Sequence, residues 1–337
     1  MKVVLRADAS RDVGTGHVMR QFALAEELIR QGAEVFLVGG VSGPSWLERK
    51  LTTLPGLQRI SQPIGTFDGG ILEEIGACVS TIDSYALGQS ELAEWESKCL
   101  RTLVFIDGPW QRLTGGVAVA PAIIDHSSWI DDLRRRFDSV HAGPDFLMIR
   151  TEIRQVRQQL LQKPPVSPQI LVVIGGVDPR GHTDVIDSAL SEFSSEAKIV
   201  IMRNDISRRF KRTELRSRRE IFPSPRSDLA EELAKSQLVI SAAGTTTGEL
   251  LFLEMPSIFI PVVDNQFENA QALETIGSSS VLWPDSSNFV GDLKAMVRQA
   301  LVRDYARTPP KPNSPVVDGL GARRLAALLL SSLKRGR

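Results

Sequence analysis

Hydrophobic and polar positions alternate along the chain in two recurring patterns. Short apolar runs rich in Val, Ile and Leu are typical of strands buried in a parallel sheet. They are separated by longer stretches in which apolar residues recur every three or four positions, as in amphipathic helices. In the first half of the chain the predicted strands are 3–7, 34–39, 78–83, 102–107 and a run near 139–143. The clearest predicted helices there are 17–32 and 89–100.

The same alternation starts again after a stretch of different composition. Residues 151–168 are charged, rich in Gln and end with three prolines, which is typical of an interdomain linker. Beyond this linker, strands are predicted at 169–176, 198–202, 219–223, 237–244 and 257–263. Helices are predicted at 227–236, 244–255 and 265–277.

This order of elements predicts an α/β protein. Parallel neighbouring strands need crossover connections, so alternating strands and helices indicate two parallel sheets covered by helices. We expect two doubly wound, Rossmann-like domains, 1–150 and 169–315, facing a central cleft near the carboxyl ends of the strands, where ligands bind in such folds. The amphipathic segment 316–337 is expected to form a helix that packs back on the domains.

Composition narrows the class of protein. Among 337 residues, acidic and basic side chains balance at 40 each, which gives no electrostatic footprint for nucleic acid or a membrane surface. No apolar run approaches the roughly 20 residues that a membrane span needs, and the N-terminal MKVVLRAD is a strand pattern. Cys78 and Cys99 have no metal-ligand spacing. We expect a soluble, cytoplasmic protein with reduced thiols; the sequence does not indicate an oligomeric state.

The first predicted strand is followed by a glycine-rich turn that opens the first helix. Gly14 and Gly16 allow a close turn, and the helix start offers free N–H groups to an anion. A dinucleotide site would need a third glycine where Met19 stands and an acidic residue where Gly39 and Gly40 stand, so both requirements for NAD fail and the turn does not favour it. His17 is either a helix-capping or packing residue, or a proton acceptor, since the helix dipole disfavours imidazolium there.

Two further turns follow strands of the second block. One contains Gly175 and Gly176, and the other contains Gly244, three threonines at 245–247, and Glu249. Glycine, hydroxyls and N–H groups at the positive end of a helix dipole can hold a diphosphate without a metal, and a nearby carboxylate can accept from ribose hydroxyls. Ordinary helix capping by the threonines and a favourable charge at a helix start would produce the same pattern.

Three segments together resemble a known family. The sequences GTGHVMRQFALAEEL, VVIGGVDPRGHT and SAAGTTTGELLFLEMPSIFIPVVDNQFENA are similar to the UDP-2,4-diacetamido-2,4,6-trideoxy-β-L-altropyranose hydrolases of pseudaminic acid biosynthesis. More broadly, they resemble the GT-B superfamily that contains MurG. The similarity runs from Val3 to about Gly277, and RADAS with GTGHVMR is its most specific part. The resemblance implies a GT-B-like fold and a UDP-linked amino sugar as substrate, with no cofactor and no metal.

The resemblance also implies roles for individual residues. His17 would be the catalytic base that deprotonates water for attack at the anomeric carbon. Residues expected to bind the sugar side of the substrate are Arg6, Asp8, Gly14, Gly16, Asp83, Tyr85, Asp107, Asn265 and Gln266. Residues expected to bind the nucleotide are Gly175, Gly176, Gly244, Thr245, Thr246, Thr247 and Glu249. For Tyr85 the alternative is a packed loop aromatic, and for Asn265 and Gln266 it is a helix cap.

The chain departs from the family pattern between residues 107 and 128. Asp107 is followed by Gly-Pro-Trp, and Asp125-His126-Ser127 stands where the family has amides. The identity of the sugar therefore stays open. We interpret His126 as a polar loop residue rather than a sugar contact, His141 as the end of a buried strand, and His182 as a helix cap or a phosphate neighbour.

The sequence is compatible with three functions. The first is a metal-independent UDP-sugar hydrolase. The second is a GT-B glycosyltransferase that uses the same donor with an acceptor hydroxyl in place of water. The third is a non-catalytic nucleotide-sugar-binding protein. The sequence favours the hydrolase because its match is strongest at the first turn.

Overall fold

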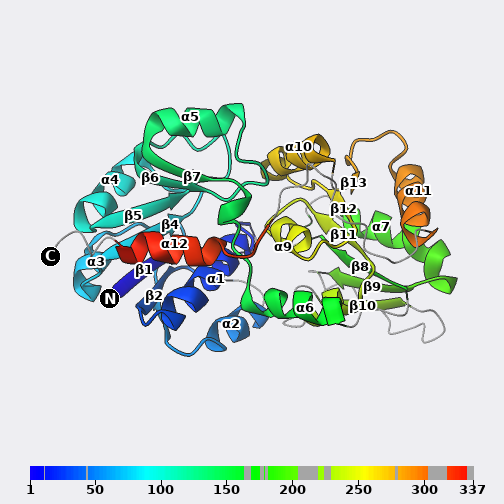
Figure 1. The fold of residues 1–337 in the computed structure, drawn as a ribbon, viewed down its shortest axis with the longest axis horizontal. Coiled ribbons are helices and arrows are strands. Elements are labelled where there is room, and N and C mark those ends of the chain that lie inside the picture. The colour runs from blue at the N-terminus through cyan, green and yellow to red at the C-terminus, as the bar shows by residue number, and fades with distance from the viewer. Residues whose placement is uncertain are drawn as a thin grey trace. The chain divides into compact units, whose positions relative to one another are not determined.

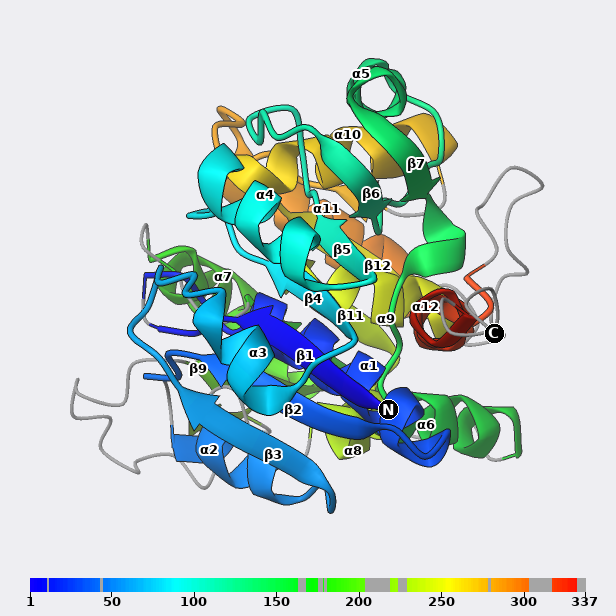
Figure 2. The ribbon, with the colours of Figure 1, turned by 90° about the vertical axis from the view of Figure 1, so that its left-hand side faces the viewer.

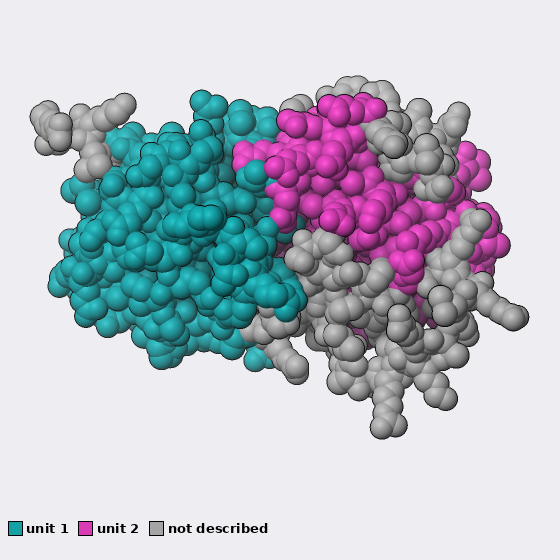
Figure 3. Space-filling model, turned by 90° about the horizontal axis from the view of Figure 1, so that it is seen from below, with its two compact units in different colours: residues 1–151, 317–337 teal, residues 152–316 magenta. Residues whose placement is uncertain are grey.

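A computed structural model of the chain describes residues 1–10, 12–42, 45–162, 168–174, 178, 181–203, 219–223, 229–277, 280–302 and 317–331. The chain divides into two compact units (Figure 3). Unit 1 consists of Met1–Thr151 and Val317–Arg337, and unit 2 of Glu152–Val316. Unit 1 is therefore discontinuous in sequence, because the end of the chain returns to it.

Unit 1 contains a seven-stranded parallel sheet in the order β3-β2-β1-β4-β5-β6-β7. Figure 2 shows this order running from β3 at the bottom to β7 at the top. The strands are β1 (Lys2–Ala7), β2 (Glu34–Gly39), β3 (Leu57–Ser61), β4 (Val79–Asp83), β5 (Arg101–Phe105), β6 (Gly115–Ala120) and β7 (Phe137–Ala142). The helices are α1 (Gly16–Arg30), α2 (Ser45–Thr52), α3 (Gly70–Ile75), α4 (Gln89–Lys98), α5 (Ser128–Arg136), the short η1 (Pro144–Phe146) and α12 (Gly321–Leu330).

Helices cover both faces of this sheet. Because successive strand residues point to opposite faces, neighbouring residues of one strand enter different cores. Val3 and Leu5 of β1 enter the core formed with α1, α2 and α12, whereas Val4 enters the core formed with α3, α4 and α5. Helix α12 packs beside α1, as Figure 1 shows, through Leu325 and Leu329. The final amphipathic segment thus completes one layer of unit 1.

Unit 2 contains a six-stranded sheet in the order β10-β9-β8-β11-β12-β13. Its strands are β8 (Gln169–Val173), β9 (Lys198–Arg203), β10 (Arg219–Pro223), β11 (Leu238–Ala242), β12 (Ser257–Ile260) and β13 (Ser280–Val281), all paired in parallel. Its helices are α6 (Thr151–Gln162, which begins at the boundary), α7 (His182–Leu190), η2 (Ser191–Ser195), α8 (Leu229–Lys235), α9 (Thr246–Phe252), η3 (Asp264–Gln266), α10 (Phe267–Ile276) and α11 (Phe289–Val302). Side chains of α7 and α11 cover one face of this sheet.

The two parallel, helix-covered sheets confirm the predicted α/β fold class. Most of the stretch predicted as a linker, residues 151–162, forms helix α6, which the sequence analysis did not predict. Ile153, Val156 and Leu160 are buried on one face of this helix, and their spacing of three and four is a helical signal that the polar composition obscures. Among the described residues, no helix is long and apolar enough to span a membrane.

Candidate active site

The candidate site of unit 1 lies at the carboxyl ends of three neighbouring strands. Strand β4 pairs with β1 on one side and with β5 on the other, and Ala7 lies opposite Asp83. Asp83 is the last residue of β4, and Asp107 comes two residues after the end of β5. Helix α1 begins at Gly16 beyond the end of β1, so His17 is in its first turn. Parallel topology thus brings residues distant in sequence to one edge of the sheet.

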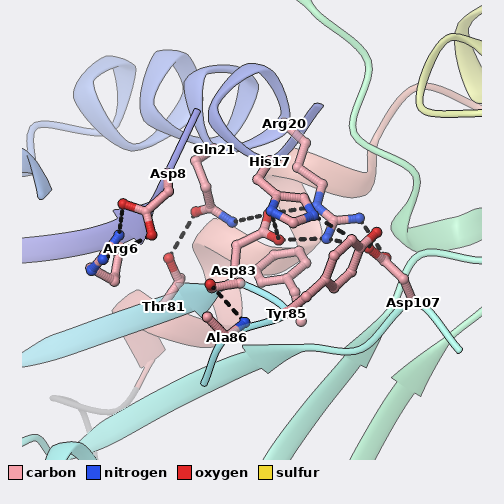
Figure 4. A network of polar contacts seen from close by, with 12 residues as sticks. Arg6, Asp8, His17, Arg20, Gln21, Thr81, Asp83, Tyr85, Ala86 and Asp107 are labelled. Atoms are coloured by element: carbon pink, nitrogen blue, oxygen red, sulfur yellow. Dashed lines mark hydrogen bonds and ion pairs between the residues drawn. The ribbon is translucent and has the colours of Figure 1, made fainter. Parts of the chain in front are cut away.

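Arg20 is the centre of the polar network in Figure 4. Its guanidinium donates to both oxygens of Asp83 at 2.5 Å and to the two oxygens of Asp107 at 2.6 and 2.9 Å. Bidentate pairs of this kind are the strongest and most directional carboxylate contacts that a side chain makes. One cation therefore bridges two carboxylates that belong to different strand ends.

His17 lies between the same two carboxylates. Its Nδ1 is 3.9 Å from Asp83 and its Nε2 is 3.8 Å from Asp107. Both distances exceed a hydrogen bond, and Nδ1 has no hydrogen-bond partner among the described residues. The imidazole is buried, with 6% of its surface exposed. It is a base held close to two acidic groups without being bonded to either.

Tyr85 closes this network on the outer side. Its hydroxyl donates to Asp107 Oδ2 at 2.8 Å, and its ring meets the His17 ring edge-on with centroids 4.4 Å apart. The side chain is 42% exposed, although its hydroxyl points into the network. Trp110 lies beyond it, with ring centroids 6.3 Å apart. Tyr85 thus contacts the imidazole and one carboxylate at the same time.

The charges of Arg20 and of the two carboxylates stabilise each other's ionised forms, which shifts the pKa values of Arg20 and Asp107. Burial alone would raise the pKa of Asp107, but the charge and hydrogen bonds of Arg20 hold that pKa below its usual value, with smaller contributions from His17 and Tyr85. Burial alone would lower the pKa of Arg20, and attraction by Asp107 and Asp83 holds it well above its usual value. Burial, followed by the nearby Asp107 carboxylate, raises the pKa of Tyr85. Tyr85 therefore keeps its proton and stays a hydrogen-bond donor.

Asp83 has a second set of partners behind it. Gln21 donates to Asp83 Oδ2 at 3.1 Å and accepts from the Thr81 hydroxyl at 2.7 Å. His17, Arg20 and Gln21 are spaced three and four residues apart on α1, so they share one helix face. Sequence reasoning missed Arg20 and Gln21, and this spacing from His17 is the signal that points to them.

The residues His17, Asp83 and Asp107 also offer one ligand atom each, all within 4.8 Å of one another. Such an arrangement suits a metal ion. Arg20, however, already bonds both carboxylates, and its positive charge opposes a divalent cation placed among them. The guanidinium supplies the charge that a metal would bring.

Arg6 and Asp8, predicted to bind substrate, form a buried ion pair at the end of β1. Arg6 has none of its surface exposed and donates to both Asp8 oxygens at 2.7 and 2.9 Å, and to the carbonyl of Thr66. Asp8 accepts from the backbone N–H groups of Gly40 and Gly65. These contacts hold the loops after β2 and β3, so any role of this pair toward substrate stays a prediction.

The two glycines of the first turn have different places. Gly14 is buried with a φ of 80°, which favours glycine, and it exchanges backbone hydrogen bonds with Ser10. Gly16 is the first residue of α1. The turn between them sets the start of the helix that carries His17.

The described part of the predicted nucleotide site lies after β11 in unit 2. Gly244 follows the strand, Thr245 is exposed, and α9 starts at Thr246. The hydroxyl of Thr247 is buried and has no hydrogen-bond partner among the described residues. Glu249 is buried one turn into α9. Gly175 and Gly176 lie outside the described residues.

Gln266 and Asn269 hold the backbone around this turn. Gln266 accepts from the N–H of Val262 at 2.9 Å, and Asn269 donates to the carbonyl of Ala243 at 3.1 Å. A side chain added at Gly244 would come within 3.4 Å of the Gln266 amide. Asn265 is half-buried in η3, beside Gln266. The predicted residues 244–249 and 265–266 thus belong to two adjacent strand ends, those of β11 and β12.

The remaining histidines lie elsewhere. His126 is 78% exposed and paired with Asp125, in agreement with a polar loop residue. His141 is the penultimate residue of β7, where burial and the neighbouring Arg101 lower its pKa. Helix α7 is capped by Asp178, which accepts from the N–H groups of His182 and Thr183, so the interpretation of His182 as the cap is wrong. A carboxylate accepts two N–H groups at once, which the imidazole of His182 does not do.

Part of unit 2 is similar to a known family of domains. Residues 191–302 match the glycosyltransferase family 28 C-terminal domain. A protein of Methanocaldococcus jannaschii described only as uncharacterized is 23% identical over 274 residues, which is 77% of this chain and 55% of that protein. The chain therefore spans about half the length of this relative.

Solved structures are similar over nearly the whole chain. Acinetobacter baumannii MurG is 15% identical with a TM-score of 0.59, over 98% of this chain and 100% of MurG. The spinosyn forosaminyltransferase SpnP is 16% identical with a TM-score of 0.62, over 98% and 99%. Arabidopsis thaliana UGT89C1 complexed with UDP is 11% identical with a TM-score of 0.64, over 97% and 99%. The chain thus has the GT-B-like fold of MurG and related glycosyltransferases, and its unit 2 contains a region similar to the family 28 C-terminal domain.

Proposed function

We propose that the protein is a metal-independent nucleotide-sugar hydrolase that releases UDP from a UDP-linked acetamido- or diacetamido-deoxy sugar. In this proposal unit 2 holds the nucleotide and unit 1 supplies the chemistry. The observation that carries it is the His17 imidazole, which is buried between the carboxylates of Asp83 and Asp107 and has no hydrogen-bond partner at Nδ1 among the described residues. A general base must keep one nitrogen available for a proton, and Nδ1 of His17 meets this requirement next to two carboxylates.

The nucleotide half of the proposal rests on unit 2. The match to the family 28 C-terminal domain covers Gly244, the three threonines, Glu249, Asn265 and Gln266. GT-B relatives bind nucleotide-sugar donors, and one of the similar structures was determined with UDP. The buried Thr247 hydroxyl without a partner among the described residues is free to donate to a ligand oxygen. We assign 245–247 to the diphosphate and Glu249 to the ribose.

The chemistry follows from groups in unit 1. His17 takes a proton from water as the water oxygen forms a bond to the anomeric carbon. The bond from that carbon to the phosphate oxygen breaks, and its electron pair leaves with UDP. Attack opposite the leaving group inverts the anomeric centre. Asp83 and Asp107, each about 4 Å from an imidazole nitrogen, stabilise the imidazolium that forms. A positioned base of this kind contributes about 10²–10⁴-fold.

A glycosyltransferase is the second candidate, and the comparisons favour it specifically. The solved structures similar to this chain include a forosaminyltransferase, and the family match is to a glycosyltransferase domain. The donor site and the base would be the same, with an acceptor hydroxyl in place of water. A non-catalytic nucleotide-sugar-binding protein would use unit 2 alone and leave His17 without a role.

One assay separates the three functions. The purified protein is incubated with a panel of UDP-amino sugars and a chelator, with and without candidate acceptors, and UDP release is followed. The hydrolase releases UDP without acceptor, and the transferase releases it only when an acceptor is present. Binding without release under both conditions identifies the third function. A need for a divalent ion would contradict the proposal that the site works without a metal.

A further inference from the structure

Arg20 occupies a position that neither the general-base mechanism nor the nucleotide site uses. It sits on α1 one turn after His17 and makes four hydrogen bonds, two to Asp83 and two to Asp107. The two carboxylates come from separate strand ends, and among the described residues the Arg20 guanidinium is the group that bonds both of them. Both oxygens of each carboxylate therefore accept from the same guanidinium.

The imidazole is left out of these bonds. Each of its nitrogens faces one carboxylate at 3.8–3.9 Å, which is close enough for electrostatic stabilisation and too far for a hydrogen bond. We propose that Arg20 is a positioning residue, which holds Asp83 and Asp107 on either side of the His17 ring and prevents either carboxylate from binding the ring directly. The inference rests on the proposed role of His17 as a base.

The charge around Asp107 makes the role of Arg20 testable by pH. The groups that face Asp107 are Arg20 and His17 from α1, Tyr85 from the loop after β4, and Gln111, whose side chain accepts from the Asp107 N–H. Asp83 is the other carboxylate on the same guanidinium. Arg20 is the permanent cation of this set, so its removal would take the neutralising charge away from buried Asp83 and half-buried Asp107 at the same time.

Lysine cannot reproduce this arrangement. An ammonium is a compact charge with no planar fork, so it can neutralise the carboxylates but cannot hold both in a bidentate geometry. Arg20→Lys therefore tests position, and Arg20→Gln tests charge. Arg59 offers a matched control, since it makes a bidentate pair with Glu48 in which both side chains are solvent-accessible.

The first experiment measures melting temperature against pH and needs no substrate. In the parent protein Asp107 has a lowered pKa, so its contribution to stability is present above the unfolded pKa of about 3.9 and is lost as pH falls. In Arg20→Gln burial is opposed only by the smaller contributions of His17 and Tyr85, so the pKa of Asp107 rises relative to the parent and its contribution to stability at neutral pH shrinks. The gap between parent and variant should therefore widen from mildly acidic to neutral pH.

The double variant Arg20→Gln with Asp107→Asn completes this experiment. Because an amide carries no charge, the double variant should melt higher than Arg20→Gln at neutral pH, and the gap should no longer depend on pH. Arg59→Gln should show a small gap that is constant over the same range. A constant gap for Arg20→Gln, with no recovery in the double variant, would overturn the inference.

The second experiment compares UDP release by the parent, Arg20→Lys and Arg59→Lys. Misplaced carboxylates should lower kcat of Arg20→Lys by about 10–100-fold, with KM and UDP affinity near those of the parent. The acidic limb of its pH profile should move to higher pH. Asp107 loses bidentate hydrogen bonds that lower its pKa, and a protonated Asp107 no longer stabilises the imidazolium that forms on His17. An unchanged pH profile would show that Arg20 acts only in folding. If the parent itself releases no UDP, the proposed function fails while the melting series still decides the inference.

Discussion

At the scale of single residues, the polar network of unit 1 surrounds the His17 imidazole. The four histidines of the chain differ in surroundings, and within the part of the chain that the structure describes His17 is the one that lies between two carboxylates. Exposed His126 has one neighbouring carboxylate, and half-buried His141 has a cationic neighbour. A substitution of His17 therefore tests the proposed base, and the same substitution of exposed His126 is its control.

His17→Asn should reduce turnover about 10²–10⁴-fold while UDP affinity stays within a few fold of the parent, because the change removes the proton acceptor from unit 1 and leaves the predicted nucleotide residues of unit 2 intact. Single-turnover UDP release and calorimetric UDP binding measure the two effects. His126→Asn, at an exposed loop position, should leave both unchanged. Wild-type turnover in His17→Asn would remove the imidazole from the mechanism.

Tyr85 reports on the same network without any substrate. The sequence has two tyrosines, Tyr85 and Tyr305, so Tyr305→Phe leaves Tyr85 as the sole phenol. Burial and Asp107 raise the pKa of Tyr85, so its phenolate absorbance should appear well above the ordinary value of about 10. Adding Asp107→Asn should move the titration to lower pH, since it removes a negative charge next to the hydroxyl.

Near-ultraviolet spectra taken along an alkaline titration measure this shift, with a chain lacking both tyrosines as the baseline. Ionisation of Tyr85 at the ordinary pKa in the Tyr305→Phe protein would show that its hydroxyl faces water and not Asp107. The network in unit 1 would then need revision.

The residues of this network show how far sequence reasoning reaches. The sequence-based prediction named His17, Asp83, Tyr85 and Asp107 as site residues, and the structure places all four within one network. Arg20 was missed because its partners lie 63 and 87 positions away, and a charged residue in the first turns of a helix usually faces solvent. Pairing over such distances follows from strand order, which local periodicity does not specify.

At the scale of elements, apolar periodicity predicted some helices and strands to within a few residues and missed others. Helix α1 was predicted at 17–32 and spans Gly16–Arg30. Strand β3 at the edge of the first sheet was not predicted, because its burial pattern contains no run of buried residues. An edge strand has a neighbouring strand on one side only, and the exposed side chains of β3 leave no continuous apolar run in its sequence.

Helix α12 makes a prediction at this scale. Leu325 is fully buried where α12 packs with α1, the helix that carries His17 and Arg20. Leu325→Ala should lower the free energy of unfolding by about 2–5 kcal/mol, because it leaves a cavity between the two helices. Leu328→Ala, at a half-buried position of the same helix, should cost clearly less. Denaturant titration measures both, and equal losses would contradict the packing of α12 on α1.

At the scale of the whole molecule, the chain combines two α/β units whose proposed tasks differ. The first unit carries the acid–base network, and the second carries the turn after β11 that matches the family 28 domain. Variants in one unit should therefore change turnover, and variants in the other should change nucleotide affinity. Residues 175 and 176 belong to the same prediction for unit 2, and their role stays a prediction.

Thr247→Val gives this division of tasks its sharpest test. The Thr247 hydroxyl is buried and lacks a hydrogen-bond partner among the described residues, so replacing it by an isosteric methyl should leave the unliganded protein as stable as the parent or more stable by about 1 kcal/mol. If that hydroxyl donates to a phosphate oxygen, the same change should weaken UDP binding about 10-fold, the loss expected for one hydrogen bond to a charged group. Melting temperature without ligand and calorimetric UDP binding measure the two effects independently.

Thr245→Val provides the comparison for this variant, because Thr245 is exposed and its hydroxyl can be solvated in the free protein. A purely structural hydroxyl at Thr247 would lose stability and affinity together, whereas a ligand-directed one separates them. Weakened UDP binding at unchanged stability supports a diphosphate site after β11. Unchanged affinity in both threonine variants would place the nucleotide elsewhere in unit 2 and remove the stated basis for assigning Glu249 to the ribose.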